Sequence, residues 1–286
     1  MNEAYINIME QEKQLQLHIT KNDRKIITDF ANSLSDKEYQ LRCMWAIQIL
    51  ESKLTMINLE LQENLQREVV VRLTHCIKSA ESIFLKLRRK GYTINLDNAK
   101  KKLNDIVGVR VTCIFRDDIY ALVDCLKIQH DIKILKIKDY IKTPKSSGYQ
   151  GVHMILSVPI YLSKKTEWMK VELQLRTVAM DSWSVLDYQL LYKKDLVDTG
   201  EIVQELKRYS DVIADMDTNM MRLRDKIKEI LSASLALFLL AEISLYIDLT
   251  ILYLLLIEAN SRFRYYSSYE SNFAYGKRLQ NSFQIG

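Results

Sequence analysis

The fold is decided by residues 138–177, which read KDYIKTPKSSGYQGVHMILSVPIYLSKKTEWMKVELQLRT. This stretch contains both prolines of the chain, Pro144 and Pro159, and two of its seven glycines, Gly148 and Gly151. Elsewhere the chain is long, charged and almost free of residues that interrupt helices. Within the stretch, a lysine-rich loop leads into a Gly-Tyr turn, and two runs with strand character follow.

The second run, residues 171–176 (VELQLR), has one polar face. Alternate side chains of a strand share a face, so Glu172, Gln174 and Arg176 are predicted to project together, opposite three aliphatic side chains. The preceding loop adds three lysines: Lys138, Lys142 and Lys145. A carboxylate, an amide and a guanidinium beside a basic loop suit a phosphorylated ligand.

Composition sets broad limits on the kind of protein. A chain of 286 residues with 48% hydrophobic residues can form one sizeable globular domain with helical extensions, or two small domains. The net charge of +5 fits a nucleotide or RNA ligand, but many proteins with neither role share it. The cysteines lack metal-site spacing and the N-terminus lacks a signal-peptide core, so free thiols and a cytoplasmic location are expected.

Residues 1–70 contain no glycine or proline and are predicted to form a helical N-terminal extension. Ser35 and Glu38 have the spacing of a capping box, and a less regular helix is expected before Ser35. Apolar residues then recur at helical spacing: Leu41, Met44, Trp45, Ile47, Leu50, Leu54, Ile57 and Leu61. This apolar face is typical of a helix that packs on a domain or mediates oligomerisation.

Residues 71–195 alternate between strand-like and helix-like patterns. The predicted strands cover 106–115, 132–137, 152–158 and 169–175, and the predicted helices cover 79–90, 117–128 and 178–194. Gly91 suits a C-terminal cap on the first helix. The basic cluster Arg88, Arg89 and Lys90 at that end either complements the helix dipole or contacts a ligand. Helices between strands predict a sheet domain of the α/β or α+β class.

The last part of the chain changes character abruptly. A charged helix is predicted over 196–230, followed by a tail, 231–286, whose first part is almost entirely apolar. Residues 231–257 are long enough to span a bilayer, although a central Asp costs roughly 2.5–3.5 kcal/mol on insertion scales. Three interpretations remain open: a buried self-association helix, a membrane-attached helix, or a tail produced by a shifted reading frame.

Several ordered motifs of the central region resemble the synthetase domain of RelA/SpoT proteins, over roughly residues 70–225. The motifs are DIVGVR at 105–110, KDYI at 138–141, a Pro-Lys, Gly-Tyr and His series ending at His153, and VELQLRT at 171–177. The closer likeness is to the stand-alone small alarmone synthetases of bacteria, the RelQ and RelP type. The occurrence of these motifs in the family's order is far more specific than any single motif.

The resemblance implies an α+β, nucleotidyltransferase-like fold with a mixed sheet flanked by helices. It also implies transfer of pyrophosphate from ATP to the 3′-hydroxyl of GDP or GTP, giving the alarmones ppGpp and pppGpp of the stringent response. Asp105 resembles the family's Mg²⁺ ligand, and Glu172 resembles the catalytic glutamate that binds metal or takes the hydroxyl proton. The cofactor expected on this basis is Mg²⁺, and a homotetramer is the expected assembly.

The remaining site residues follow from the same resemblance. Tyr149 matches the tyrosine that stacks on guanine, and the other residues expected on the GDP or GTP side are Lys138, Lys145, His153 and Gln174. The residues expected on the ATP side are Lys78, Arg88 and Arg110, with Arg110 at the adenine. Taken singly, each of these side chains has an ordinary structural explanation, so the combined order of the motifs carries the assignment.

Three departures from the family pattern affect the expected ATP site and the helix after the last strand. Cys76 stands where an arginine normally stacks on adenine, Gly151 stands where the Gly-Tyr signature has serine, and Asp187-Tyr188 replaces a Glu-His pair. An alternative function therefore stays open: an impaired synthetase that binds guanine nucleotide or RNA as a regulator. Membrane contact through 231–257 is a further alternative for localisation.

Overall fold

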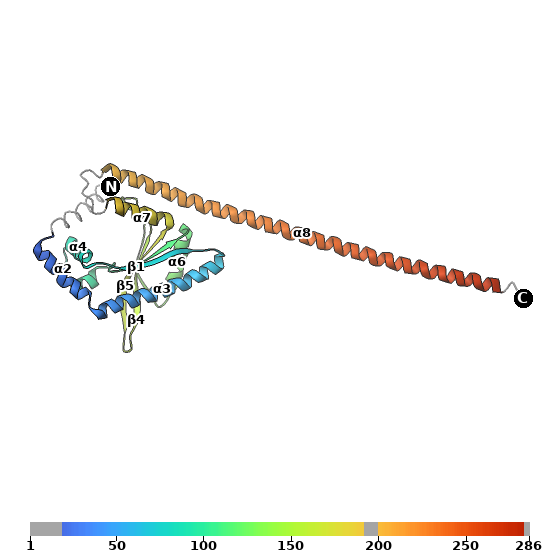
Figure 1. Ribbon diagram of the computed structural model, residues 1–286, viewed down its shortest axis with the longest axis horizontal. Helices are drawn as coiled ribbons and strands as arrows, with labels where there is room; N and C mark the ends of the chain where they lie inside the picture. The colour runs from blue at the N-terminus through green and yellow to red at the C-terminus, as the bar shows by residue number, and fades with distance from the viewer. Residues whose placement is uncertain (1–18, 192–199, 283–286) are drawn as a thin grey trace. The chain divides into compact units, whose positions relative to one another are not determined.

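The computed structural model describes residues 19–191 and 200–282, and the chain divides into two compact units that meet between Arg222 and Leu223. The first unit contains a five-stranded sheet with flanking helices (Figure 1). The strands are β1 (Val70–Ile77), β2 (Val107–Cys113), β3 (Lys133–Asp139), β4 (Val152–Tyr161) and β5 (Thr166–Thr177). The helices are α2 (Lys21–Leu34), α3 (Lys37–Leu65), α4 (Ala80–Arg89), α5 (Leu96–Lys102), α6 (Arg116–Lys127), α7 (Val178–Leu191) and α8 (Gly200–Ser282).

The sheet is mixed, which confirms the predicted α+β class. Its strand order is β1-β2-β5-β4-β3; β2 and β5 run parallel, and the other neighbouring pairs run antiparallel. The predicted alternation of β5 is also confirmed, because Val171, Leu173 and Leu175 are fully buried on one face. That face joins the hydrophobic core, and the polar face of β5 lies on the other side of the sheet.

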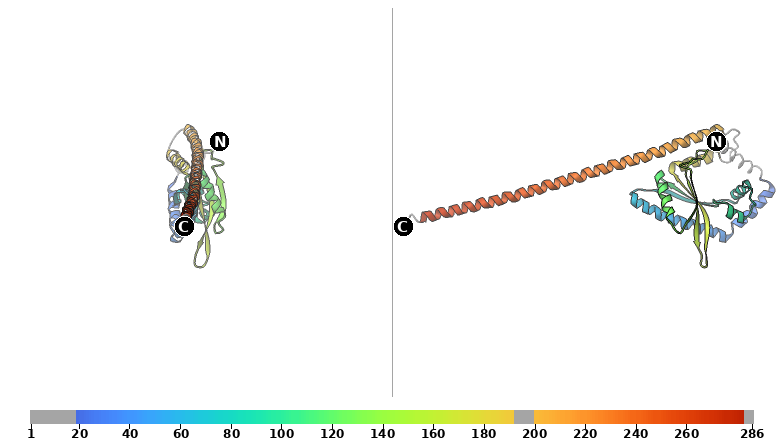
Figure 2. Two further views of the ribbon diagram at one scale, coloured as in Figure 1. Left: turned by 90° about the vertical axis from the view of Figure 1, so that its right-hand side faces the viewer. Right: turned by 180° about the vertical axis from the view of Figure 1, so that it is seen from behind.

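Helix α3 supplies much of the core and packs against β2, β4, β5 and α6. Figures 1 and 2 show α3 along one side of the sheet, with the β4–β5 hairpin projecting past it. Its buried residues are Tyr39, Cys43, Ala46, Ile47, Leu50, Leu54 and Ile57. The predicted apolar face was therefore too broad. Leu41 and Trp45 are exposed, because at 100° per residue they point away from the buried stripe.

The helices and strands up to α5 differ from the sequence prediction at four places. Asp36, not Ser35, caps α3, and its side chain accepts a hydrogen bond from the Tyr39 amide at 3.0 Å. The helix ends at Leu65 because Gln66 adopts the left-handed conformation, with φ of 52°. Strand β1 was missed entirely, and so was the short helix α5. Residues 1–18 of the predicted extension lie outside the described residues.

The beginning of α8 belongs to the first unit and is tied to the sheet and to the Gly-Tyr turn. Thr177, the last residue of β5, donates to Asp217 Oδ2 at 2.7 Å. Ser210 donates to the carbonyl of Gly148, and Gly148 adopts φ of +94° with the Ser210 Cβ only 2.8 Å from where its own Cβ would stand. A larger residue than glycine would therefore push α8 away from the turn.

Candidate active site

The polar face of β5 lies at the centre of the sheet, where three strands place their side chains together. In the sheet register, Glu172 stands between Gly108 of β2 and Ile155 of β4. Gln174 stands between Arg110 of β2 and His153 of β4. Strands β2 and β4 thus bring residues far apart in sequence to the face predicted from β5 alone.

Five side chains on this face form a closed ring of hydrogen bonds. The Tyr149 hydroxyl meets His153 Nε2 at 2.5 Å, and His153 Nδ1 meets Glu172 Oε1 at 3.1 Å. Gln174 Nε2 donates to Glu172 Oε2 at 2.8 Å. Arg176 donates from Nε to the Tyr149 hydroxyl and from a terminal nitrogen to Gln174 Oε1, both at 3.2 Å.

The ring has a direction, because Arg176 can only donate and an ionised carboxylate can only accept. Since the Tyr149 oxygen accepts from Arg176, its own proton goes to His153 Nε2, which assigns the imidazole proton to Nδ1 and leaves it to donate to Glu172. Two arms of donors therefore run from Arg176 to Glu172, one through Tyr149 and His153, the other through Gln174. Both oxygens of Glu172 are oriented.

The pKa values agree with this assignment. Burial lowers the pKa of His153, despite the opposing effect of Glu172, and this favours the neutral imidazole. Burial alone would raise the pKa of Glu172, but the hydrogen bonds from His153 and Gln174 bring the pKa below its usual value. Burial is also the main reason that the pKa of Tyr149 is raised. At neutral pH, Glu172 is ionised and Tyr149 keeps its proton.

Arg176 is itself held by a buried carboxylate that sequence reasoning missed. Asp181, in the first turn of α7, lies 3.1 Å from Arg176 and 3.4 Å from Arg110. Asp181 lies on α7, whereas Arg176 lies on β5 and Arg110 on β2, so only the fold shows that these residues pair. It connects the predicted ATP-side residue Arg110 to the hydrogen-bonded ring.

Tyr149 also lies in an aromatic and cationic cluster. The Tyr140 ring meets the rings of Tyr149 and His153 edge to face, with centroids 5.8 and 5.3 Å apart. The Lys145 ammonium lies 4.4 Å from the Tyr149 ring centroid and 4.7 Å from that of Tyr140. Burial is the largest cause of a lowered pKa at Lys145. Two residues predicted for the guanine nucleotide, Tyr149 and Lys145, are thus in contact.

A second cluster centres on Asp105, just before β2. Lys78 and Lys86 each place an ammonium group 2.6 Å from Asp105 Oδ2. Burial opposes ionisation of Asp105, but the two lysines outweigh it and bring its pKa to about 2. Its other oxygen, Oδ1, is buried and has no hydrogen-bond partner among the described residues. This unpartnered oxygen is suited to a cation that is not part of the chain.

A cavity of about 250 Å³ connects the two clusters, since both Asp105 and Glu172 line it. Most of its other lining is basic. The lining lysines in the described structure are Lys86, Lys90, Lys102, Lys136 and Lys138, and the remaining lining residues are Leu103, Asn104 and Ile155. Ammonium groups in this excess over carboxylates make the cavity a suitable site for phosphate groups.

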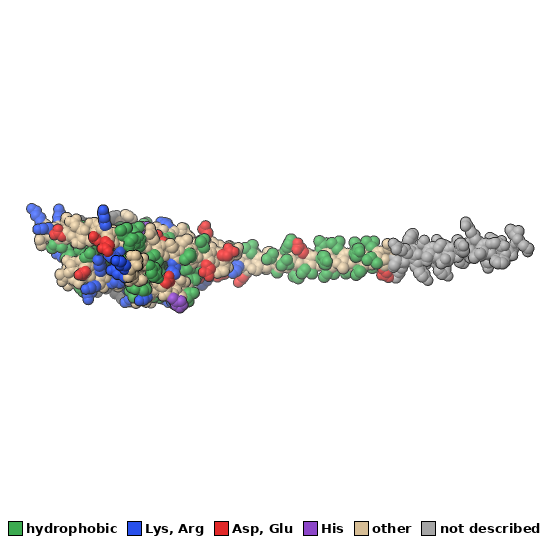
Figure 3. Space-filling view, turned by 90° about the horizontal axis from the view of Figure 1, so that it is seen from below, with side chains coloured by type: hydrophobic (Ala, Val, Ile, Leu, Met, Phe, Trp, Pro, Cys, Tyr) green, Lys and Arg blue, Asp and Glu red, His purple; other side chains and the backbone are tan. Residues whose placement is uncertain are grey.

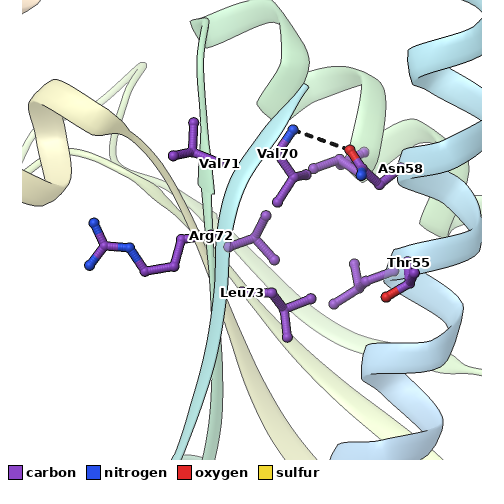
Figure 4. Close-up of a pocket in the computed structure, with 9 residues that line it drawn as sticks. Thr55, Asn58, Val70, Val71, Arg72 and Leu73 are labelled. Carbon is purple, nitrogen blue, oxygen red and sulfur yellow. Dashed lines mark hydrogen bonds between the residues drawn. The ribbon is translucent and has the colours of Figure 1, made fainter. Parts of the chain in front are cut away.

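Another cavity in the described structure, about 160 Å³ between α3 and β1, has a different lining (Figure 4). Six of its nine lining residues are aliphatic: Leu54, Val70, Val71, Leu73, Val111 and Leu122. Figure 4 shows the hydrogen bond that the Val70 amide donates to the Asn58 side chain, with a length of 3.1 Å. Arg72 is its one ionisable lining residue, and Figure 4 shows the Arg72 side chain directed away from the aliphatic group. This cavity therefore offers no acid–base or phosphate chemistry.

The structure brings most of the predicted site residues to one side of the sheet, but it places Arg88 elsewhere. Arg88 pairs with Asp23 of α2 at 3.1 Å. Lys86, which was not predicted, occupies the corresponding place beside Asp105. The reason is helical geometry: residues two apart differ by about 200° in direction, whereas Lys86 and Lys90, four apart, share a face and both line the cavity.

The departures from the family pattern are also placed by the structure. Cys76 is exposed on β1 and pairs with Gly108 of β2. Gly151 has φ of +148°, and an added Cβ would lie 3.1 Å from the Leu175 carbonyl and 3.3 Å from the Tyr149 hydroxyl. The local backbone thus requires glycine at position 151. Tyr188 is about half exposed on α7.

Comparisons with known proteins show which family this chain resembles. Residues 75–196 match the family model described as the region found in RelA/SpoT proteins. GTP pyrophosphokinase YwaC of Bacillus subtilis is 33% identical over 215 residues, covering 74% of this chain and all of the relative. GTP pyrophosphokinase YjbM of the same organism is 29% identical over 157 residues, covering 55% of this chain and 73% of the relative.

Solved structures give the same result. Small alarmone synthetase 2 from Bacillus subtilis superposes with a TM-score of 0.58 and 34% identity, covering 65% of this chain and 97% of that one. Small alarmone synthetase 1 from Bacillus subtilis, bound to its product pppGpp, also has a TM-score of 0.58, with 28% identity, 68% coverage of this chain and 100% of that one.

Proposed function

This chain belongs to the RelA/SpoT family, and from that premise we propose that it is a GTP pyrophosphokinase that makes ppGpp or pppGpp from ATP and GDP or GTP. One observation supports the assignment most directly: two arms of hydrogen-bond donors converge on Glu172 at the wall of a lysine-lined cavity. A fixed, ionised carboxylate beside a phosphate-binding cavity suits transfer of the terminal pyrophosphoryl group of ATP to a hydroxyl, with AMP as the leaving group.

On the acceptor side, Glu172 is the proposed catalytic base for the 3′-hydroxyl of the guanine nucleotide. The ring orients its two oxygens, so a bound hydroxyl would meet a carboxylate of fixed position. Tyr149 is the proposed stacking surface for guanine. Lys145 lies over that ring now, and it would have to move aside to contact the acceptor phosphates. Lys138, His153 and Gln174 complete the proposed acceptor residues.

On the donor side, Lys78 and Lys86 are the proposed contacts of the ATP phosphates. Both ammonium groups now neutralise Asp105, so a triphosphate would replace one anionic partner by another. Arg110 remains the proposed adenine contact. Arg88 also remains an ATP-side prediction, and contact with ATP would require it to leave Asp23.

The residues present fit Mg²⁺. Asp105 offers a buried oxygen without a partner, and Mg²⁺ commonly binds one or two carboxylates together with substrate phosphates. Asp105 would hold the ion, and Glu172 lines the same cavity as a second candidate ligand. When bound, Mg²⁺ would neutralise charge on the phosphates.

A synthesis assay tests this function. Purified protein would be mixed with Mg²⁺, ATP labelled in its terminal phosphates, and GMP, GDP or GTP in turn. Label is expected on the 3′ position of the guanine nucleotide, and comparison of the three acceptors gives the preferred substrate. Absence of product at every ATP concentration would overturn the synthesis proposal.

The second candidate is an impaired synthetase that binds guanine nucleotide or RNA as a regulator. Cys76 favours it, because a thiol cannot supply the cation–π contact that an arginine makes with adenine. Guanine nucleotide binding by calorimetry, without synthesis, is its expected signature. A Cys76→Arg variant that gains synthesis would show that the acceptor half of the site is intact.

The proposed domain organisation follows the sequence prediction, with synthetase residues 71–195 between an N-terminal extension, 1–70, and a helix, 196–230. A cytoplasmic synthetase and a homotetramer are proposed with it. Exposed apolar residues on the outer stripe of α3 support self-association: Leu41, Trp45, Met56 and Leu59. Light scattering on the full chain and on a Trp45→Glu variant would measure it. A single monomeric mass for the wild type would contradict a tetramer.

A further inference from the structure

The second unit contains a helical segment whose apolar side chains are exposed. Residues 231–257 read LSASLALFLLAEISLYIDLTILYLLLI and form part of the continuous helix α8. This part of α8 is long and apolar enough to cross a membrane, and its apolar window is 0% buried within the described structure. Figure 3 shows hydrophobic side chains along the visible face of the helix beyond its charged part. Exposure of such an apolar surface to water is unfavourable in free energy.

The length of the segment matches a bilayer. At 1.5 Å per residue, residues 231–257 extend for about 40 Å, compared with about 30 Å for the hydrocarbon core of a membrane. A tilted helix of this length would cover the core at both ends. The neighbouring sequence before Leu231 is charged, so the apolar part has a defined beginning.

The apolar surface surrounds the helix instead of forming a stripe. Its two carboxylates, Glu242 and Asp248, are six residues apart and therefore point about 120° away from each other. Ser234 and Thr250 are likewise separated by more than 90° around the axis. A soluble helical bundle needs one continuous polar face for water, whereas a helix that is apolar all round is buried in a large core or in lipid.

The polar groups in the segment are also compatible with lipid. The Thr250 hydroxyl donates to the carbonyl of Tyr246 at 2.8 Å, and the Ser232 hydroxyl donates to that of Lys228 at 2.8 Å. These hydroxyls therefore need no water as acceptor. Glu242 and Asp248 are different, because each is a carboxylate that opposes insertion.

The flanking sequence has the features of two membrane interfaces. Before the segment, residues 222–230 carry four basic side chains and two acidic ones, Asp225 and Glu229, which leaves a net positive charge; the basic residues are Arg222, Arg224, Lys226 and Lys228. After it the sequence continues with basic and aromatic residues: Arg262, Phe263, Arg264, Tyr265 and Tyr266. Basic residues favour anionic lipid surfaces, and aromatic residues favour the boundary between headgroups and hydrocarbon.

From the length, the all-round apolar surface and these flanks, we propose that residues 231–257 insert into a lipid bilayer that contains anionic lipid, and so attach the chain to a membrane. Insertion depends on this segment alone, so it can be tested whether or not the protein synthesises alarmones. A second copy of the chain is the competing occupant of the same apolar surface.

Flotation of the full chain with vesicles tests this inference. The vesicles would contain phosphatidylethanolamine and phosphatidylglycerol, and the bound fraction would be washed with 1 M salt and then with alkaline carbonate. The wild type is expected to float and to remain bound after both washes. A Leu245→Arg/Leu252→Arg variant is expected to lose at least tenfold of the floating fraction, because it places two charges within the apolar run.

The matched control is Leu223→Arg/Ile230→Arg, which adds the same charges at two exposed positions before the run and is expected to float like the wild type. Glu242→Gln/Asp248→Asn is expected to increase the bound fraction. The inference would be overturned by wild type that stays unbound, by binding that salt removes, or by equal flotation of the Leu245→Arg/Leu252→Arg variant. If the protein instead forms a soluble oligomer and does not bind vesicles, the segment would be assigned to contacts between copies of the chain. The inference would also be overturned if mass spectrometry of the protein isolated from cells detected no peptides from residues 231–257.

Discussion

Asp105 and Glu172 line the same cavity, but they are held by different kinds of partner. Two ammonium groups neutralise Asp105 at 2.6 Å, and its second oxygen is left without a partner among the described residues. Glu172 has a hydrogen bond on each oxygen, from a neutral imidazole and a neutral amide. The region of Asp105 is thus built for exchange of charged partners, whereas the region of Glu172 is built to keep one carboxylate in place.

Under the proposed function, this difference would let one sheet serve two substrates. Ion pairs that a triphosphate and a metal can replace suit the donor side, since charge is conserved during the exchange. A hydrogen-bonded ring that starts at Arg176 suits the acceptor side, where position matters more than charge. Substitutions can change either the Asp105 region or the Glu172 region while leaving the other region in place.

The largest effect is expected for Glu172→Gln. The amide keeps the shape of the side chain but removes the base and the acceptor character of one oxygen, so kcat should fall by about 10²–10⁴-fold. Guanine nucleotide binding should persist, because Tyr149 is unchanged. Initial rates of synthesis and calorimetric titration with GDP would measure the two quantities.

Glu167→Gln is the matched control on the same strand, because Glu167 pairs with Arg42 at 2.6 Å and with Lys165 outside the cavity. It should keep the wild-type rate. More than a tenth of the wild-type rate in Glu172→Gln would contradict a catalytic role for Glu172.

A smaller effect is expected for Tyr149→Ala, which removes the proposed guanine-stacking surface. Stacking of a base on an aromatic side chain contributes roughly 1–3 kcal/mol, so the Kd for GDP should rise roughly 5- to 150-fold. Tyr149→Phe keeps the ring and removes only the hydroxyl between Arg176 and His153. It should bind GDP nearly as the wild type does and lower kcat, which separates stacking from orientation of Glu172.

Tyr161→Ala provides the control for Tyr149→Ala, since Tyr161 ends β4 and is 67% exposed. Equal losses of GDP affinity in the Tyr149 and Tyr161 variants would argue against stacking at Tyr149.

The donor side can be tested through its acid stability. The pKa of Asp105 is lowered from 3.8 to about 2, so the ionised form stabilises the fold above pH 4 by about 2 kcal/mol, and this contribution is lost as the pH falls toward 2. Asp105→Asn should be less stable at neutral pH and should lose less of its remaining stability on acidification. Urea unfolding between pH 3 and pH 6 would measure this change in slope.

Asp97→Asn, at an exposed position in the first turn of α5, should keep the wild-type slope. Glu172 contributes in the same direction, because its pKa is also lowered, so Glu172→Gln should remove a separate part of the slope. An unchanged slope in Asp105→Asn would contradict the ion pairs with Lys78 and Lys86.

The sequence predicted the acceptor side of this comparison better than the donor side, for a physical reason. Alternation along β5 is a local property, so the common face of Glu172, Gln174 and Arg176 could be derived from spacing alone. The pairing of Arg176 with Asp181 depends on how α7 leaves the sheet, and no local pattern encodes it. Helix α4 was predicted, but its cavity-facing residue was not, because Lys86 and Arg88 have similar chemistry and different directions.

The elements missed from the sequence share a similar cause. Strand β1 lies at the edge of the sheet and most of its residues are exposed, so it lacks the alternation of a half-buried strand. The end of α3 at Leu65 was not predicted, because the residue in the left-handed conformation that ends the helix is Gln66 and not the usual glycine or asparagine. In contrast, the helices after β2 and β5 follow from strong local patterns and were predicted correctly, and the mixed sheet was expected from the resemblance to RelA/SpoT proteins.

The smallest effect is expected at Cys76, on the edge strand β1. Cys76→Arg would restore a guanidinium next to Gly108, where β1 and β2 pair. A cation–π contact with adenine contributes about 1 kcal/mol, so the KM for ATP should fall about fivefold with little change in kcat. Thr74→Arg is the matched control, because Thr74 is exposed and two residues away on the same face of β1.

The pair of variants separates a specific contact from a general gain of positive charge. Improvement in Cys76→Arg alone would place adenine at β1 and would extend the exchangeable donor region from Asp105 to the edge of the sheet. Equal improvement in both variants would indicate only electrostatic attraction of ATP, which high salt would abolish. No change in either variant would show that adenine binds away from Cys76, so that Arg110, held by Asp181, would become the nearest remaining adenine contact proposed for this site.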